Sequence, residues 1–266
     1  MKKRIISAIV MLLIAVPLLI VGHLPFAIFV TTVGACGLYE LLHMREEKKE
    51  FPFLLKIFAY LLVMFFILYN RGTDDFTYYL DYRVMAFIMF FFLAPMVFIN
   101  DKKKYNANDA IFLIGSTLFV GLAFNLILQI RNYSLFYIIY LFLITIFTDI
   151  FAMEIGKRIG KTKMVETISP NKTWEGSAGG IIMGTFVAST FYLTVVDSSA
   201  NIFVIVLLTM FLSAVGQLGD LVFSSIKRYY GKKDFSNLIP GHGGILDRLD
   251  SIIFVALAFI ILFGLI

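Results

Sequence analysis

The sequence predicts an all-α, polytopic integral membrane protein of about nine transmembrane helices, with its N-terminus in the cytoplasm. Of the 266 residues, 60% are hydrophobic and only 15% are charged, and the mean hydropathy is +0.89. Soluble domains average about 45–50% apolar residues. Apolar stretches repeatedly reach the roughly 17–25 residues that a spanning helix requires. Lysine and arginine are also distributed very unevenly between alternate connections.

The predicted spans are separated mostly by short polar connections. The first span is not expected to be a cleaved signal peptide, because no small-residue cleavage site stands out and a second span follows at once. The second is the least regular, since Gly34, Gly37 and Glu40 interrupt it. The spans cover residues 5–22, 24–43, 51–70, 82–99, 109–130, 133–155, 175–196, 202–224 and 250–266.

Lysine and arginine set the expected orientation, because both favour the cytoplasmic side. With the N-terminus inside, all but three of the 23 fall on that side, the exceptions being Arg71, Arg83 and Arg131. A miscounted span would reverse every later connection and destroy this asymmetry. The net charge of +5 therefore indicates topology and lipid-headgroup contact, and no nucleic-acid partner is expected. We expect a multi-pass protein of the cell (inner) membrane.

The chain is predicted to divide into a transmembrane scaffold region at 1–132 and a catalytic transmembrane region at 133–266. Two cytoplasmic loops of the second region, 156–176 and 227–250, are polar, basic and interrupted by Gly and Pro. The first region has nothing comparable, so scaffold, oligomer contact or lipid access is its expected role. A single cysteine, Cys36, excludes an intrachain disulfide.

Acidic residues inside the predicted spans are candidate functional groups. A charge at the centre of a span costs about 2.5–3.5 kcal/mol unless it faces a polar cavity or a partner. Asp149 and Glu154 lie near the inner end of one span. Each could instead pair with a nearby cation and only fix helix packing.

Asp220 is the strongest of these acids. It shares a helix face with Ser224 and Lys227 through i, i+4, i+7 spacing. Gly216 and Gly219 on the same helix would allow a backbone or a ligand to approach closely. The packing interpretation is weaker here.

Asp247 and Asp250 have i, i+3 spacing, so their carboxylates share a face of a helical turn. Taken alone, they could be the favourable acids of a helix start, next to the positive end of the helix dipole. Together with Asp220 they offer three carboxylates at one depth on the cytoplasmic side. Hard oxygen ligands without Cys or clustered His favour Mg²⁺, commonly completed by substrate phosphates. The surrounding cations suit a phosphate-rich substrate.

The glycine-rich stretch before Asp247 admits two interpretations. Gly243 and Gly244 would let backbone N–H groups approach phosphate oxygens, or they could form a helix-breaking turn. His242 is either a phosphate donor or proton carrier, or a turn histidine at an interface.

The upstream stretch ISPNKTWEG reads as a turn followed by a helix start. Asn171 or Thr173 would cap the helix, and Trp174 would lie at the membrane interface. Lys172 is either a phosphate ligand or one more topology charge.

Residues 224–250, SSIKRYYGKKDFSNLIPGHGGILDRLD, resemble the signature of the phosphatidate cytidylyltransferases, the CDP-diacylglycerol synthases. That pattern runs Ser-x-apolar-Lys-Arg, four residues, Lys-Asp, then Pro-x-His-Gly-Gly and Asp-Arg-apolar-Asp. SPNKTWEG resembles the family's second motif, and Asp149 falls where the family has an acid, although the following IFAME departs from the pattern. Every fixed position of the signature is filled, by Ser224, Lys227, Arg228, Lys233, Asp234, Pro240, His242, Gly243, Gly244, Asp247, Arg248 and Asp250.

The resemblance implies an enzyme that makes CDP-diacylglycerol and pyrophosphate from CTP and phosphatidate, with Mg²⁺ and a second cation such as K⁺ as an open possibility. Asp220, Asp247 and Asp250 are the expected metal ligands, and with Lys227 and Arg248 they form the expected catalytic set. A homodimer is a family-level expectation. The expected substrate-binding residues are Ser169, Asn171, Lys172, Arg228, Lys233, His242, Gly243 and Gly244.

Two other classes of function stay open at this point. A related membrane CTP-dependent enzyme, such as a CDP-archaeol synthase or a polyprenol kinase, shares the combination of carboxylates, cations and an apolar acceptor. A cation-coupled transporter would also use intramembrane acids, but it would place them near the midplane and often in a repeated half. The charged features here gather at the cytoplasmic edge, and no repeat is visible.

Overall fold

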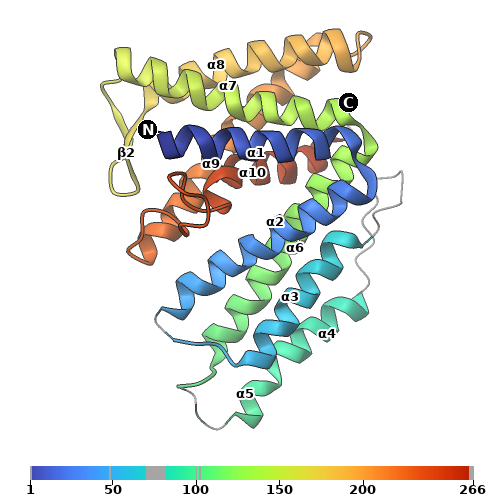
Figure 1. Ribbon diagram of the computed structural model, residues 1–266. Helices are drawn as coiled ribbons and strands as arrows, with labels where there is room; N and C mark the ends of the chain where they lie inside the picture. Colours follow the sequence, from blue (N-terminus) through green and yellow to red (C-terminus); the bar gives the residue numbers. More distant parts are fainter. Residues whose placement is uncertain (1, 48, 70–81, 100, 102, 264–266) are drawn as a thin grey trace. The chain divides into compact units, whose positions relative to one another are not determined.

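The computed structural model describes residues 2–47, 49–69, 82–99, 101 and 103–263, with side chains from residue 5 onward (Figure 1). This part of the chain is nearly all helical. It includes five helices that are long and apolar enough to cross a membrane: His23–Glu46, Ala107–Tyr133, Leu135–Ile159, Trp174–Val196 and Ile202–Tyr229. Two parts of the prediction lie outside the described residues. These are the connection that contains Arg71 and the end of the last predicted span, residues 264–266.

Helices cover each of the predicted span ranges within the described residues. The span predicted at 82–99 forms two helices, because Pro95 begins a short second one. The elements in chain order are α1 (Lys2–Val21), α2 (His23–Glu46), α3 (Phe53–Leu68), α4 (Tyr82–Leu93), α5 (Pro95–Phe98), α6 (Ala107–Tyr133), α7 (Leu135–Ile159), β1 (Lys163–Val165), β2 (Ser169–Thr173), α8 (Trp174–Phe191), the π-helical turn η1 (Tyr192–Val196), α9 (Ile202–Tyr229) and α10 (Leu246–Leu262).

The chain forms two compact units. Unit 1 contains Met1–Asn132 together with Phe235–Ile245, and unit 2 contains Tyr133–Asp234 together with Leu246–Ile266. The first boundary in the chain lies between residues 132 and 133. The signature stretch contributes to both units, since its glycine loop belongs to unit 1 and its aspartates belong to unit 2.

Buried polar groups of unit 1 hold its helices together. Asn125 of α6 is fully buried, and its amide donates to the carbonyl oxygens of Phe66, Ile67 and Tyr69 at 2.9, 3.0 and 2.8 Å. These are carbonyls at and just after the C-terminal end of α3, which have no partner within the helix. Arg131 does the same for the end of α1, donating to Leu19 and Ile20.

Small residues allow close helix packing in unit 2. A β-carbon on Gly180 of α8 would lie 2.6 Å from the carbonyl oxygen of Thr148 in α7, so only glycine fits. Figure 1 shows α7 and α8 running side by side. Gly219 of α9 likewise faces Phe254 and the carbonyl of Asp250 in α10. The close approach by a backbone that the sequence predicted for Gly219 is confirmed.

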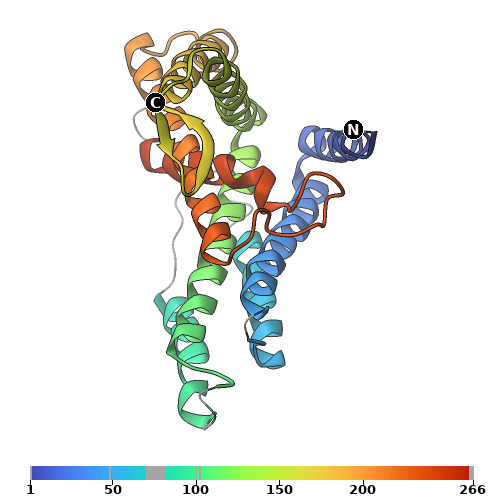
Figure 2. The same ribbon diagram turned by 90° about the vertical axis from the view of Figure 1, so that its left-hand side faces the viewer.

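A two-stranded hairpin corrects the all-α expectation. The segment read as a turn before α8 is strand β2, which pairs antiparallel with β1 in the register Lys163↔Thr173 and Val165↔Ser169, drawn as arrows in Figure 2. The hairpin closes on the first turn of α8, where Glu175 accepts from the backbone N–H of Lys161 and Thr162. Pairing satisfies backbone groups that a lone turn would leave to water. The sequence offered no period-2 alternation long enough to reveal it.

Candidate active site

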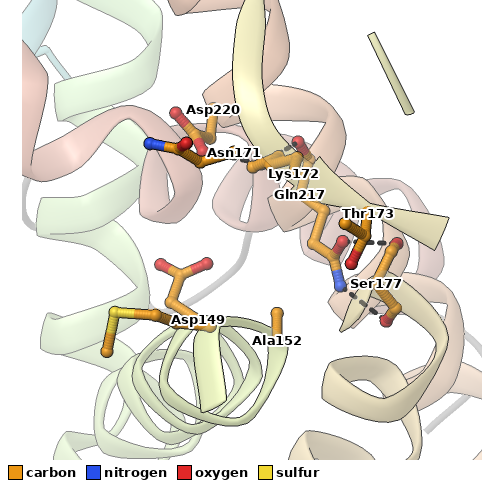
Figure 3. Close-up of a pocket in the computed structure, with 9 residues that line it drawn as sticks. Asp149, Ala152, Asn171, Lys172, Thr173, Ser177, Gln217 and Asp220 are labelled. Carbon is orange, nitrogen blue, oxygen red and sulfur yellow. Dashed lines mark hydrogen bonds and ion pairs between the residues drawn. The ribbon is translucent and has the colours of Figure 1, made fainter. Parts of the chain in front are cut away.

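A pocket of about 240 Å³ lies within unit 2, bounded by α7, β2, α8 and α9. Figure 3 shows carboxylates, a lysine and two amides gathered around it. Three predicted site residues line it: Asn171, Lys172 and Asp220. The full lining is Asp149, Ala152, Met153, Asn171, Lys172, Thr173, Ser177, Gln217 and Asp220.

The pocket holds an ion pair that stays accessible to solvent. Lys172 Nζ lies 2.6 Å from Asp220 Oδ2, and the two side chains are 22% and 30% exposed. The Lys172 ammonium also donates to the carbonyl oxygen of Gln217 at 3.4 Å. Asp149 attracts the same lysine and repels Asp220. Lys172 therefore interacts with both the Asp149 and Asp220 carboxylates on the wall of an open cavity.

The local fold explains how Lys172 reaches this position. The hairpin holds β2 along the pocket, so the consecutive residues Asn171, Lys172 and Thr173 all line it. Thr173 then caps α8, accepting from Gly176 N at 3.2 Å, as one of the two caps that the sequence suggested. Asn171 is exposed beside the pocket and does not cap the helix.

A reciprocal pair forms the pocket's inner wall. Ser177 Oγ donates to Gln217 Oε1 at 2.5 Å, and Gln217 Nε2 donates back to the Ser177 carbonyl oxygen at 3.0 Å. Both residues are buried. Gln217 is three positions before Asp220, so the pair also fixes the helix face that carries this carboxylate.

A second ion pair joins α9 to α10. Lys227 Nζ lies 2.6 Å from Asp247 Oδ1, and the side chains are only 10% and 4% exposed. Asp250, 9% exposed, accepts from Ser251 N at 2.7 Å, and its charge interacts with those of Asp220 and Lys227. Ser224 Oγ donates to Asp220 Oδ1 at 3.3 Å. The shared face predicted for Asp220, Ser224 and Lys227 is thus confirmed.

The other predicted residues of unit 2 are more peripheral. Ser169 is half-buried in β2, whereas Arg228, Lys233 and Arg248 are exposed. The Arg228 guanidinium donates to the carbonyl oxygens of Ile168 and Lys232 at 3.2 and 2.9 Å.

The predicted glycine loop is described within unit 1. Backbone bonds fold it into a tight turn, in which Ile239 N donates to the Gly243 carbonyl oxygen and His242 N to that of Ile239, both at 2.9 Å. Gly241 and Gly243 adopt φ of 80° and 86°, a region that favours glycine. His242 Nδ1 lies 2.7 Å from Ser7 Oγ.

Comparison with known proteins identifies the relationship. The model of the Cytidylyltransferase family matches residues 2–266. The chain belongs to this family. A Bacillus subtilis (strain 168) protein named phosphatidate cytidylyltransferase is 37% identical over 262 residues, covering 96% of this chain and 94% of its own. Proteins of the same name from Staphylococcus haemolyticus (strain JCSC1435) and Staphylococcus aureus (strain COL) are 37% and 36% identical over 256 residues, covering 96% of each chain.

The carboxylate oxygens at the site of this cytidylyltransferase family member are the type of ligand that Mg²⁺ prefers. Asp250 interacts electrostatically with both Asp149 and Asp220. Within the described residues, however, no three His, Cys, Asp or Glu side chains are grouped closely enough to hold an ion by themselves. Mg²⁺ is commonly held by one or two carboxylates plus substrate phosphates. The residues therefore fit an ion whose coordination a substrate completes.

Sequence reasoning missed part of the pocket. The sequence leaves Asp149 open between a packing and a functional role, and the structure puts it on the pocket wall. No sequence pattern indicates Ser177 or Gln217, because a serine and a glutamine in apolar helices carry no motif of their own. Glu154, by contrast, takes the packing role, pairing with Lys157 and Arg158 on the exposed face of its helix.

Proposed function

We propose that the chain is a phosphatidate cytidylyltransferase, which transfers CMP from CTP to phosphatidate and yields CDP-diacylglycerol and pyrophosphate. The observation that carries the proposal is the accessible Lys172–Asp220 pair, 2.6 Å long, in a pocket formed by the second family motif and α9. Relatives at 36–37% identity over 96% of the chain bear this name.

The reaction needs charge neutralisation more than a protein nucleophile. A phosphate oxygen of phosphatidate attacks the α-phosphorus of CTP, and the bond between that phosphorus and the pyrophosphate oxygen breaks. Both reactants are polyanions, so their approach is opposed by repulsion that fixed cations remove. The remaining rate acceleration would come from holding the attacking phosphate oxygen in line with the bond that breaks.

Lys172 is the cation best suited to exchange partners. Asp220 holds the Lys172 ammonium in the pocket at 2.6 Å. A phosphate oxygen can replace one carboxylate contact without burying an unpaired charge. Asn171 and Ser169 of the same strand would donate to substrate oxygens. Arg228, Lys233 and Arg248 are exposed cations that would attract and hold the nucleotide phosphates.

Asp220, Asp247 and Asp250 are the proposed ligands of Mg²⁺, which would neutralise phosphate charge and polarise the reacting phosphorus when bound. A second cation such as K⁺ could share the site. Lys227 forms a buried ion pair with Asp247, so it would adjust the net charge of the carboxylates at the site. The turn at His242, Gly243 and Gly244 would contribute backbone donors to the pyrophosphate end of CTP.

The membrane arrangement follows from the substrates. Phosphatidate keeps its acyl chains in the bilayer and offers its headgroup at the surface, whereas CTP arrives from the cytosol. We therefore propose nine spans with a cytoplasmic N-terminus in the cell membrane, a site that opens to the cytoplasm and sideways to lipid, and a homodimeric assembly. The distribution of lysine and arginine supports this orientation.

Substrate profiling of the purified protein tests the proposal. With Mg²⁺ present, phosphatidate should release pyrophosphate from CTP and form CDP-diacylglycerol. An unphosphorylated polyprenol accepted in place of phosphatidate would indicate a kinase, and a preference for an archaeal ether-lipid phosphate would indicate a CDP-archaeol synthase. A transporter would release no pyrophosphate.

A further inference from the structure

Glu40 of α2 is a fully buried carboxylate in the half of the chain expected to be scaffold. Its Oε1 atom accepts from Ser236 Oγ at 2.6 Å and from Ile245 N at 2.7 Å. These partners are the two ends of the signature's glycine loop, so one oxygen atom joins residues that are nine positions apart. Figure 2 shows this loop alongside α2.

The loop between these ends has its own internal order. Leu238 N donates to Ser236 Oγ at 3.1 Å. The Ser236 hydroxyl therefore bridges Glu40 and the loop backbone. The turn at Ile239–Gly243 follows. His242 and Gly243 therefore lie in a segment whose ends are both fixed by the same side chain.

Gly244 provides the space that the carboxylate occupies. A β-carbon at this position would lie 2.5 Å from Glu40 Oε1 and 2.8 Å from Cδ. Gly244 has no left-handed φ, so the requirement for glycine here is steric and not conformational. The second glycine of the Gly-Gly pair thus serves the buried glutamate, whereas Gly243 serves the turn.

We propose that Glu40 is a positioning residue for the reaction, which fixes the shape of the loop 236–245 and so presents His242 and the Gly243 backbone to the phosphates of CTP. This rests on the proposed function. Charge-assisted hydrogen bonds to backbone N–H and hydroxyl groups are short and about twice as strong as neutral ones. Burial of Glu40 also keeps water from replacing these hydrogen bonds.

The first test separates positioning from plain stability. In Glu40→Ala, the KM for CTP should rise about tenfold or more, while the KM for phosphatidate should change less than about twofold. Glu40→Gln keeps an acceptor oxygen and should recover much of the affinity for CTP. Loss of folding alone would lower the amount of active enzyme and leave both KM values unchanged, and that result would overturn the proposal. Glu154→Gln, which alters an exposed carboxylate outside the pocket lining, should match wild type.

The second test uses the steric match and does not require Glu40→Ala to fold. Gly244→Ala should raise the KM for CTP because the new methyl group displaces the carboxylate. Shortening the carboxylate in Gly244→Ala/Glu40→Asp should then lower that KM relative to Gly244→Ala alone. If the effects of the two substitutions on the KM for CTP are simply multiplicative, the loop does not depend on this contact and the proposal is wrong. If wild type itself fails to make CDP-diacylglycerol, the proposed function fails instead, so the two failures are distinct.

Discussion

Asp109 of unit 1 and Asp220 of unit 2 are both carboxylates paired with cations, yet their surroundings differ. Asp109 is 1% exposed, forms ion pairs with Arg45 at 2.7 Å and with Lys49, and also accepts from Asn106 N at the start of α6 at 3.0 Å. Asp220 is 30% exposed and shares one lysine with the Asp149 carboxylate in an open pocket.

The difference separates a charge that stabilises the fold from one that can react. Asp109 has an excess of cations and a helix N-terminus around it, so it gains nothing from a ligand. Asp220 shares Lys172 with the Asp149 carboxylate and stays accessible in the pocket, so a bound group can reach it. The number of ion-pair partners and the access to solvent therefore distinguish these two carboxylates.

The largest effect is expected from Asp220→Asn. Loss of the charge should reduce turnover of CTP and phosphatidate by about 100-fold or more, because neither Lys172 nor a metal ion would be held correctly. The midpoint of thermal unfolding should stay within a few degrees of wild type, since a partly exposed pair contributes about 0–1 kcal/mol. Turnover near the wild-type rate would remove Asp220 from the site.

Asp109→Ala should give the opposite pattern. Removing one partner of a buried ion pair typically costs about 3–5 kcal/mol, and the partly exposed cations should bring the loss here to about 2–3 kcal/mol. Thermal unfolding of the detergent-solubilised protein would measure it. The KM for CTP of the folded fraction should be unchanged, and a selective rise in that KM would contradict the comparison.

Lys172→Ala should lower kcat/KM for CTP about tenfold or more, since a phosphate would lose a charged donor. Lys161→Ala, an exposed lysine near the same hairpin and outside the pocket lining, is the matched control. Equal kinetics in both variants would mean that the pocket lysine has no special role.

The smallest effect is expected from Lys56→Ala. Lys56 lies 2.9 Å from Glu46 Oε1, and the two side chains are 28% and 19% exposed. Such pairs contribute about 0–1 kcal/mol, so both the unfolding midpoint and the KM for CTP should remain close to wild type. A loss as large as that of Asp109→Ala would show that burial does not separate the two kinds of charge.

The sequence predicted the helical ranges well, because apolar length and turn residues are local signals. It also indicated Lys172, which belongs to a motif, and Asp220, an acid inside a predicted span, and both of these residues line the pocket. It could not find Gln217, Ser177 or the hydrogen bonds of Glu40, whose partners are 40 or more positions away in the chain. The hairpin was missed for a related reason: three- and five-residue strands are too short for a periodic pattern.

Protection of the pocket by nucleotide tests the central claim most directly. The chain's single cysteine can be removed by Cys36→Ser, and Asn171→Cys then introduces a thiol on the pocket lining, with Glu166→Cys in the hairpin's exposed turn as the control. CTP with Mg²⁺ should slow alkylation of the thiol introduced by Asn171→Cys and leave that from Glu166→Cys unaffected. Unchanged alkylation at both positions, at CTP concentrations that saturate wild-type turnover, would contradict the assignment of this pocket as the reaction site.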